Sequence, residues 1–81
     1  MIRLTLYGRK DCHLCHEMRA VVEAVVDDLR AEVDEIDVDT DPALAVRYGE
    51  EVPVLLVNGA RAFAGRVTTA ALSVRLARER G

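Results

Sequence analysis

The sequence predicts an α/β fold, a four-stranded mixed sheet with flanking helices in the order β-α-β-α-β-β-α. Three observations predict it. Apolar and polar residues alternate near the start of the chain, an apolar stripe with helical spacing follows, and an Asn58-Gly59 pair separates two further strand-like segments. Because 81 residues suffice for one domain with one core, we expect a single domain over residues 1–81.

The first half of the chain is predicted to form a strand, a helix and a second strand. Residues 2–7 alternate apolar and polar side chains, and Gly8 ends this strand. A helix of about four turns follows, with both cysteines in its first turn. Its apolar stripe consists of Leu14, Met18, Val21, Val22, Val25 and Leu29. Residues 33–38 are expected to form the second strand, because Ile36 and Val38 alternate with acidic residues.

A short helix is predicted next. Asp41 can cap free amides and Pro42 suits the first helical position, and the helix is expected to end near Tyr48 and Gly49. The acidic residues around its start are expected on one solvated face of an edge strand and loop, without converging on a metal. They are Asp34, Glu35, Asp37, Asp39 and Asp41.

A hairpin and a last helix complete the predicted fold. Residues 53–57 form a continuous apolar run suited to a buried strand. Asn58-Gly59 is a strong hairpin signal, so residues 60–64 should pair back antiparallel. Thr68 or Thr69 can then cap the last helix.

Composition excludes several classes of function. The formal net charge is −3 and basic residues form no dense patch with aromatics, so nucleic acid is not an expected partner. No apolar run has the length of a membrane span or a signal peptide. We therefore expect a monomeric cytoplasmic protein without a membrane partner.

The pair Cys12 and Cys15 is the strongest functional signal. A disulfide across so short a loop removes little entropy from the unfolded chain, so it is a poor structural staple. Thiol-disulfide exchange, in contrast, needs a nucleophilic thiolate and a nearby second thiol that resolves the mixed disulfide. The start of a helix favours the thiolate. We expect Cys12, the outer residue, to be the catalytic nucleophile and Cys15 to be the catalytic resolving thiol.

Charged neighbours act on Cys12 in both directions. Arg9, Lys10 and a protonated His13 favour a thiolate, whereas an ionised Asp11 opposes one unless its carboxylate caps the helix. His13 and the following His16 are either exposed residues at the helix start or residues that tune the thiols.

Cys12-His13-Leu14-Cys15 after a first strand, with Val52-Pro53 before the third, resembles the thioredoxin superfamily. Within it, nearly the whole chain is similar to short glutaredoxin-like proteins. The resemblance implies a thioredoxin-like (glutaredoxin-like) fold and a cis peptide between Val52 and Pro53 that faces the cysteines. It also implies that the backbone of Val52 pairs with a bound peptide or with glutathione.

We expect a substrate site around the cysteine pair. The residues expected there are Val52, Pro53, Lys10, His13 and Arg66. Arg66 either meets a carboxylate of glutathione or of a partner protein, or is an ordinary surface arginine. The chain reads Cys-His-Leu-Cys where glutaredoxins have Cys-Pro-Tyr-Cys, and Gly65-Arg66-Val67-Thr68 where they have a glycine pair and a capping acid. The expected partner is a disulfide-containing protein or a glutathione mixed disulfide, with glutathione as a co-substrate, no resident cofactor and no metal site.

Three other functions compete with an oxidoreductase for the cysteine pair. Cys12-His13-Leu14-Cys15-His16 also matches the haem c attachment signal, but no methionine follows Met18 to serve as a distal ligand. A pair of cysteines after a first strand also occurs in small Cu(I) carriers, although their element order differs, and zinc is a weaker fit. A redox-inactive binding module of the same fold stays open.

Overall fold

The computed structural model describes residues 1–27 and 29–80. Within these residues, strands and α-helices follow one another in the predicted order, with one short 3-10 helix added after the second strand. The elements are β1 (Ile2–Gly8), α1 (His13–Val26), β2 (Ala31–Asp37), η1 (Val38–Thr40), α2 (Pro42–Tyr48), β3 (Val54–Val57), β4 (Ala60–Ala64) and α3 (Thr69–Arg80).

The strands form one mixed sheet in the order β2-β1-β3-β4. β1 runs parallel to β2 and antiparallel to β3, and β4 pairs antiparallel with β3. In this register Leu6 lies opposite Leu55 of β3. The mixed sheet and the antiparallel hairpin over residues 60–64 are thus confirmed, and β2 is an edge strand as expected.

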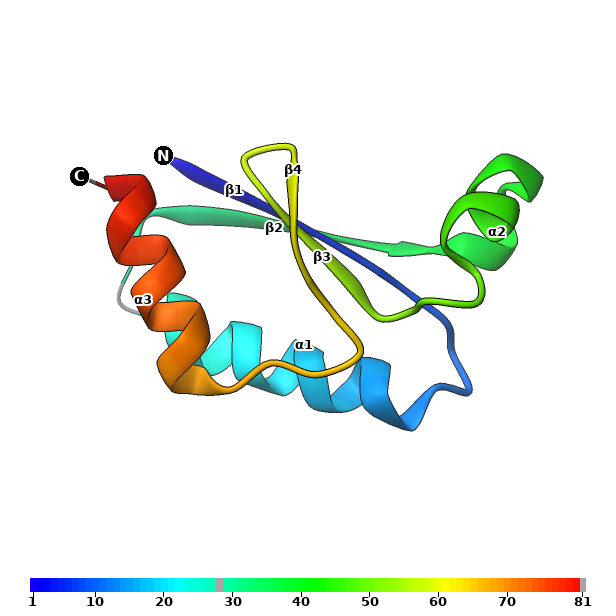
Figure 1. Ribbon diagram of the computed structural model, residues 1–81, viewed down its shortest axis with the longest axis horizontal. Helices are drawn as coiled ribbons and strands as arrows, with labels where there is room; N and C mark the ends of the chain where they lie inside the picture. The colour runs from blue at the N-terminus through cyan, green and yellow to red at the C-terminus, as the bar shows by residue number, and fades with distance from the viewer. Residues whose placement is uncertain (28, 81) are drawn as a thin grey trace.

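One face of the sheet packs against α1 and α3 (Figure 1). Because side chains alternate across a strand, every second residue of β1 turns toward these helices. Burying one Leu or Val side chain contributes roughly 1.5–3 kcal/mol, so this cluster is the main source of stability. Its buried members are Ile2, Leu4, Leu6, Met18, Val22, Leu55, Val57, Leu72 and Leu76.

A second, smaller cluster lies on the opposite face, where α2 packs near the carboxyl end of β1. Val38, Tyr48 and Val54 are buried there, with Tyr7 packed against them. The Tyr7 and Tyr48 rings stack with their centroids 4.3 Å apart and their planes 15° apart. The carboxyl end of β1 is therefore held on both faces, and the loop that leads to Cys12 starts from a fixed point.

The predicted bounds of the second strand are wrong. We expected residues 33–38, whereas β2 covers Ala31–Asp37 and Val38 begins η1. The Asp37 carboxylate accepts a hydrogen bond from the Asp39 amide at 2.9 Å, and Thr40 Oγ1 donates to the Asp37 carbonyl at 2.7 Å. These bonds turn the chain out of the strand. Val38 is apolar because it is buried under α2, not because it continues the alternation of a strand.

Most of the acidic residues of this segment are exposed on the edge strand and loop, as expected, but they do not share one face. Asp34 and Glu35 are consecutive in β2, so their side chains point to opposite faces of the sheet. Asp37 caps η1, and Asp41 accepts from the Ala43 amide at 2.9 Å as the cap of α2. Asp39 and Glu35 form ion pairs with Arg9 and Arg19. Helix capping and ion pairs with arginines therefore account for four of the acidic side chains in this segment, Glu35, Asp37, Asp39 and Asp41.

The helix boundaries follow the predicted caps closely. α2 begins with Pro42 at its first position and ends at Tyr48, as expected. Thr68, and not Thr69, caps α3, because its Oγ1 accepts from the Ala71 amide at 3.0 Å. α1 ends at Val26, so Leu29 lies beyond the helix to which its spacing assigned it, although it still packs against the core.

Candidate active site

The cysteine pair lies at the amino end of α1, and Cys12 itself caps the helix. Its backbone is extended, with φ −116° and ψ 107°, and its sulfur accepts a hydrogen bond from the Cys15 amide at 3.1 Å. The Cys12 carbonyl accepts from the His16 amide at 3.2 Å. Cys12 thus takes the position that Ser, Thr or Asp usually fills. Cys12, and not Asp11, therefore caps the helix, and the Cys15 amide points at the Cys12 sulfur.

Cys12 and Cys15 are joined in a disulfide, with their Cα atoms 5.2 Å apart. The two residues differ in access. Cys15 is 5% exposed and belongs to the buried residues of α1, whereas Cys12 is half-buried. A partner can therefore reach the Cys12 side of the bond far more readily than the Cys15 side. Cys12 is thus the outer cysteine and Cys15 the inner one, as expected.

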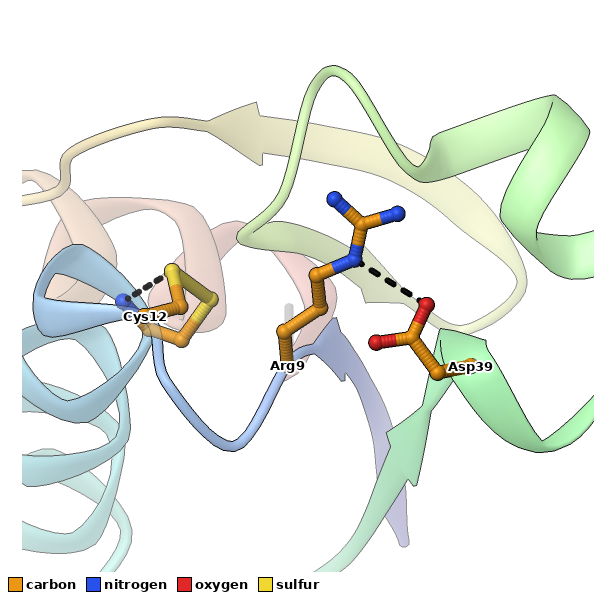
Figure 2. The surroundings of a disulfide bond; sticks show 4 residues. Arg9, Cys12 and Asp39 are labelled. Carbon is orange, nitrogen blue, oxygen red and sulfur yellow. Dashed lines mark hydrogen bonds and ion pairs between the residues drawn. A yellow bond between two sulfur atoms is a disulfide. The ribbon is translucent and has the colours of Figure 1, made fainter.

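Arg9 ties the loop before Cys12 to the other side of the site. Its Nε donates to Asp39 Oδ1 at 3.2 Å, and Figure 2 shows the guanidinium turned toward Asp39 and not toward the disulfide. A Cβ atom built at Gly49 would lie 2.8 Å from Arg9 Nη2, so the guanidinium also lies against the end of α2. Exposed ion pairs contribute about 0–1 kcal/mol, so this contact orients the loop more than it stabilises the fold.

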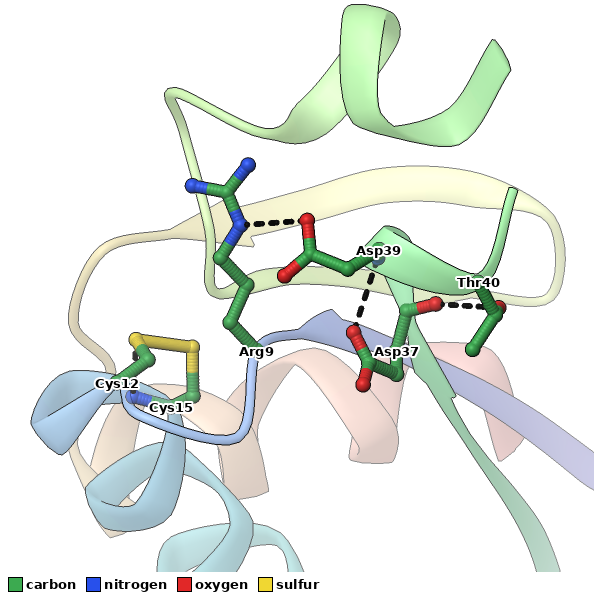
Figure 3. A network of polar contacts seen from close by, with 6 residues as sticks. All are labelled: Arg9, Cys12, Cys15, Asp37, Asp39 and Thr40. Carbon is green, nitrogen blue, oxygen red and sulfur yellow. Dashed lines mark hydrogen bonds and ion pairs between the residues drawn. A yellow bond between two sulfur atoms is a disulfide. The ribbon is translucent and has the colours of Figure 1, made fainter. Parts of the chain in front are cut away.

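The acceptor side of this ion pair is held in place by a small polar network (Figure 3). Asp37 accepts from the Asp39 amide and, through its carbonyl, from Thr40 Oγ1. Asp39 is therefore fixed by the turn of η1. The turn after β2 therefore fixes the position of the Asp39 carboxylate that Arg9 contacts. Arg9 itself lies in the loop just before Cys12.

Lys10 and His13 occupy different surroundings. Lys10 lines a cavity of about 380 Å³ together with Cys15 and His16. His13 is exposed and lies 3.9 Å from Glu17, one helical turn along α1. Lys10 and Cys15 thus border the same cavity, whereas the His13 side chain lies on the exposed face of the helix. Whether either residue binds substrate stays a prediction.

The peptide bond between Val52 and Pro53 is cis, as the family resemblance implied. Pro53 is buried, and its carbonyl accepts from the Gly65 amide at 2.8 Å. This bond links the start of β3 to the segment that enters α3. Arg66, the next residue, is exposed and lines a second cavity of about 410 Å³ with Leu14 of the Cys-x-x-Cys segment. Arg66 and the segment between the cysteines therefore border the same hollow.

One ion pair stands close to the cis peptide. Arg61 Nη1 donates to Glu51 Oε2 at 3.0 Å, directly before Val52 in the chain. The hydrogen bond from Arg61, helped by its charge, lowers the pKa of Glu51 below its ordinary value. The same bond raises the pKa of Arg61. This pair joins the segment before the cis peptide to β4.

Gly8 is the residue of this site that the sequence alone did not reveal. It is predicted only as the end of a strand, yet a Cβ atom at this position would lie 3.2 Å from both Cβ and Sγ of Cys15. The only signal in the sequence is a glycine at the end of an apolar strand, which often marks a close approach of another chain segment.

A metal site and a membrane span each place requirements on the side chains of the described residues. Among residues 1–27 and 29–80, no three His, Cys, Asp or Glu side chains are grouped so as to hold a metal ion. In the same part of the chain, every helix is too short or too polar to cross a bilayer.

Comparison with known proteins agrees with the geometry. The family described as glutaredoxin-like domain (DUF836) matches residues 3–77. The structure of protein XcR50 from X. campestris is 32% identical, with a TM-score of 0.77 over 93% of this chain and 96% of that one. A mutant thioredoxin from Halobacterium salinarum NRC-1 is 29% identical, with a TM-score of 0.73 over 95% of this chain and 73% of that one.

A more distant structure extends the likeness in fold. Chloroplastic thioredoxin z is 20% identical, with a TM-score of 0.81 over 100% of this chain and 80% of that one, which shows the shared fold alone. No curated protein matches the chain. The cis proline, the Cys-x-x-Cys pair at the start of α1 and the mixed sheet are thus found in a chain whose residues 3–77 fit one family. The chain belongs to the glutaredoxin-like (DUF836) family of the thioredoxin superfamily.

Proposed function

We propose that this protein is a dithiol oxidoreductase that reduces disulfides in proteins or mixed disulfides of glutathione. The observation that carries the proposal is the bonded pair at the start of α1, with Cys12 accessible and Cys15 buried. The similarity to a halobacterial thioredoxin supports it. The family and the fold are consistent with a redox role, and the specific activity is the proposal.

The proposed reaction has two exchange steps. In the reduced protein, the Cys12 thiolate attacks one sulfur of the substrate disulfide, and the other sulfur leaves as a thiolate that takes a proton from water. Cys15 then loses its proton to solvent and attacks Cys12 Sγ, so the second substrate thiolate leaves. The protein is oxidised to the Cys12–Cys15 disulfide and the substrate is reduced by two electrons.

The second half of the cycle returns the protein to the dithiol. Two glutathione molecules, or a dithiol reductase, supply the two electrons by the same exchange chemistry. Glutathione acts here as a co-substrate and is not retained. A reducing compartment favours the return to the dithiol, and we propose that the protein acts in the cytoplasm. We also propose that it acts as a monomer.

The proposed substrate site surrounds the accessible side of the disulfide. Val52 and Pro53 bind the backbone of the substrate, and Arg66 meets a carboxylate of glutathione or of a partner protein. The hydrogen bond between Gly65 and Pro53 supports this arrangement, because it fixes Arg66 relative to the cis peptide. Lys10 adds positive charge that attracts an anionic substrate, and His13 adds a second positive charge when it is protonated.

A comparison of the wild type with Cys12→Ser and Cys15→Ser tests the proposal. We expect the reduced wild type to reduce a small protein disulfide with multiple turnovers when glutathione is supplied. Cys12→Ser should be inactive, whereas Cys15→Ser should stop at a mixed disulfide, visible as an added mass of one substrate molecule. A Cys12→Ser variant as active as the wild type contradicts the assignment, and an inert wild type indicates a redox-inactive binding module.

A further inference from the structure

Gly8 and Cys15 approach each other so closely that a side chain at position 8 would require Cys15 to give way by a few tenths of an ångström. A Cβ atom built on Gly8 would lie 3.2 Å from both Cβ and Sγ of Cys15. Non-bonded carbon atoms attract best at about 3.5–4.0 Å, so a methyl group here would press on the cysteine. Both residues are buried, and neither can turn outward to avoid this pressure.

The backbone around this contact has little freedom to yield. Gly8 is the last residue of β1, where Tyr7 is stacked on Tyr48. Cys15 is part of α1, which Met18 and Val22 hold against the sheet with at most 1% of their surface exposed. A large movement of either element would open the core. Rotation about the Cα–Cβ bond of Cys15 can relieve the contact with its sulfur. The contact with Cys15 Cβ is the same in both redox states and needs a shift of a few tenths of an ångström.

We propose that Gly8 is a positioning residue for Cys15, because its missing side chain leaves the place from which the Cys15 sulfur reaches Cys12. This inference rests on the proposed function. In the disulfide, the Cys15 sulfur is tied to Cys12, whose sulfur also accepts from the Cys15 amide. In the dithiol, the Cys15 sulfur is free to rotate about its Cα–Cβ bond. A methyl group at position 8 therefore destabilises the disulfide more than the dithiol.

The cavity beside Cys15 gives the displaced sulfur somewhere to go. It has a volume of about 380 Å³, and both Gly8 and Cys15 line it, together with His16 and Ile36. In a reduced Gly8→Ala protein, the thiol can rotate toward this space, and α1 needs to shift by only a few tenths of an ångström. The variant is therefore expected to fold in its reduced form.

The same displacement slows the resolving step. In that step, the Cys15 thiolate forms a bond to Cys12 Sγ, the bond from Cys12 to the substrate sulfur breaks, and its electron pair leaves with the substrate thiolate. The proton of Cys15 has already gone to solvent. A sulfur that has turned toward the cavity is farther from Cys12 Sγ, so the mixed disulfide lives longer. The first step, attack by Cys12, does not involve the Cys15 sulfur.

The test is a redox titration of wild type and Gly8→Ala in buffers of reduced and oxidised glutathione, read by the mass added on thiol alkylation. We expect the equilibrium in Gly8→Ala to shift toward the dithiol by about tenfold, which corresponds to about 30 mV. The rate at which iodoacetamide alkylates Cys12 should stay within about twofold of wild type, because the first thiol is untouched. A folded Gly8→Ala with the wild-type equilibrium overturns the inference.

Gly59→Ala is the matched control. Gly59 has a φ of +84° in the hairpin turn, and no heavy atom beyond its two chain neighbours lies within 4 Å of an added Cβ. Its substitution should lower stability through backbone strain without moving the thiol equilibrium. An equal shift in Gly59→Ala contradicts a specific role for Gly8. If the wild type itself forms no disulfide in these buffers, the proposed function fails, which is a different outcome from an unshifted Gly8→Ala.

A second comparison applies if Gly8→Ala does not fold. Cys15→Gly removes both atoms that the new methyl group would meet. Gly8→Ala should therefore be tolerated in a Cys15→Gly background, as measured by thermal unfolding of the double variant against Cys15→Gly alone. Equal destabilisation by Gly8→Ala in both backgrounds overturns the inference.

Discussion

The backbone amide of Cys15 donates a hydrogen bond to the sulfur of Cys12 across 3.1 Å. Helix amino ends leave several amides without partners, and this one finds its partner in the residue proposed as the nucleophile. In the reduced protein, a negative charge on this sulfur would strengthen the bond, because hydrogen bonds to ionised acceptors are stronger than neutral ones. The hydrogen bond that caps α1 is therefore the same one that is expected to favour a thiolate at Cys12.

Arg9 is expected to affect the chemistry more than the stability. Arg9→Gln removes a positive charge from the loop before Cys12 and breaks the contact with Asp39. We predict a loss of stability of at most about 1 kcal/mol, and a several-fold slower alkylation of reduced Cys12. Alkylation kinetics and urea unfolding measure the two effects.

Arg3→Gln is the control for this substitution. Arg3 forms a comparable exposed ion pair with Glu32 at 3.1 Å, at the far end of β1 from the disulfide. Its loss should change stability by a similar amount and leave the Cys12 rate at the wild-type value. Equal slowing in Arg3→Gln and Arg9→Gln argues that net charge alone, and not the place of Arg9, sets the rate.

The stripe of α1 is tested by Val22→Asp. Val22 is 0% exposed, so the substitution buries an unpaired carboxylate in a small core. We expect a loss of more than about 3 kcal/mol, enough to unfold most of the protein. Val46→Asp on α2 is the control, since Val46 is 88% exposed. Circular dichroism should show a normal melt for Val46→Asp, and a normal melt for Val22→Asp means that the stripe is misplaced.

The cap of α3 is tested by Thr68→Ala, which removes the acceptor for the Ala71 amide. We predict a loss of about 1 kcal/mol in the free energy of unfolding, the usual cost of an amino-terminal cap. Thr69→Ala alters the first residue inside the helix and should cost clearly less. The reverse ranking in urea unfolding would move the cap to Thr69.

The Glu51–Arg61 pair predicts a small acid dependence of stability. Arg61 lowers the pKa of Glu51 in the folded protein below its unfolded value. The folded state therefore gains stability above the unfolded pKa, and this gain is lost as the pH falls through the folded pKa. Glu51→Gln should lower the melting temperature slightly at about pH 7 and have no effect at about pH 2.

The neighbouring residue supplies the control for the acid dependence. Glu50 is also exposed, and Glu50→Gln is expected to leave the difference between neutral and acid melting temperatures as in the wild type. If Glu51→Gln and Glu50→Gln behave alike at both pH values, the hydrogen bond from Arg61 contributes nothing to folding.

The order of elements could be predicted because local patterns encode it. Alternation in residues 2–7, the apolar stripe of α1, Asp41-Pro42 and Asn58-Gly59 each act within a few residues. The end of β2 could not be predicted in this way. Val38 is buried by contact with α2, a tertiary effect, and alternation cannot distinguish this from burial in a strand.

The site was predictable in its chemistry and less so in its geometry. The spacing of Cys12 and Cys15 points to thiol exchange, and the resemblance to a family supplied the cis peptide before Pro53. The ion pair of Arg9 joins residues thirty positions apart. The contact of Gly8 with Cys15 depends on how β1 packs against α1. Neither contact leaves a periodic trace in the sequence.

The most direct test of the central claim is the pH dependence of alkylation of reduced Cys15→Ser, in which Cys12 is the one remaining thiol. A cysteine at the start of a helix, with an amide pointing at its sulfur, should become reactive well below the ordinary thiol value of about 8.5. The account predicts a midpoint of the rate profile below about 7.5. A midpoint at or above about 8.5 would contradict the role of Cys12 as the activated nucleophile.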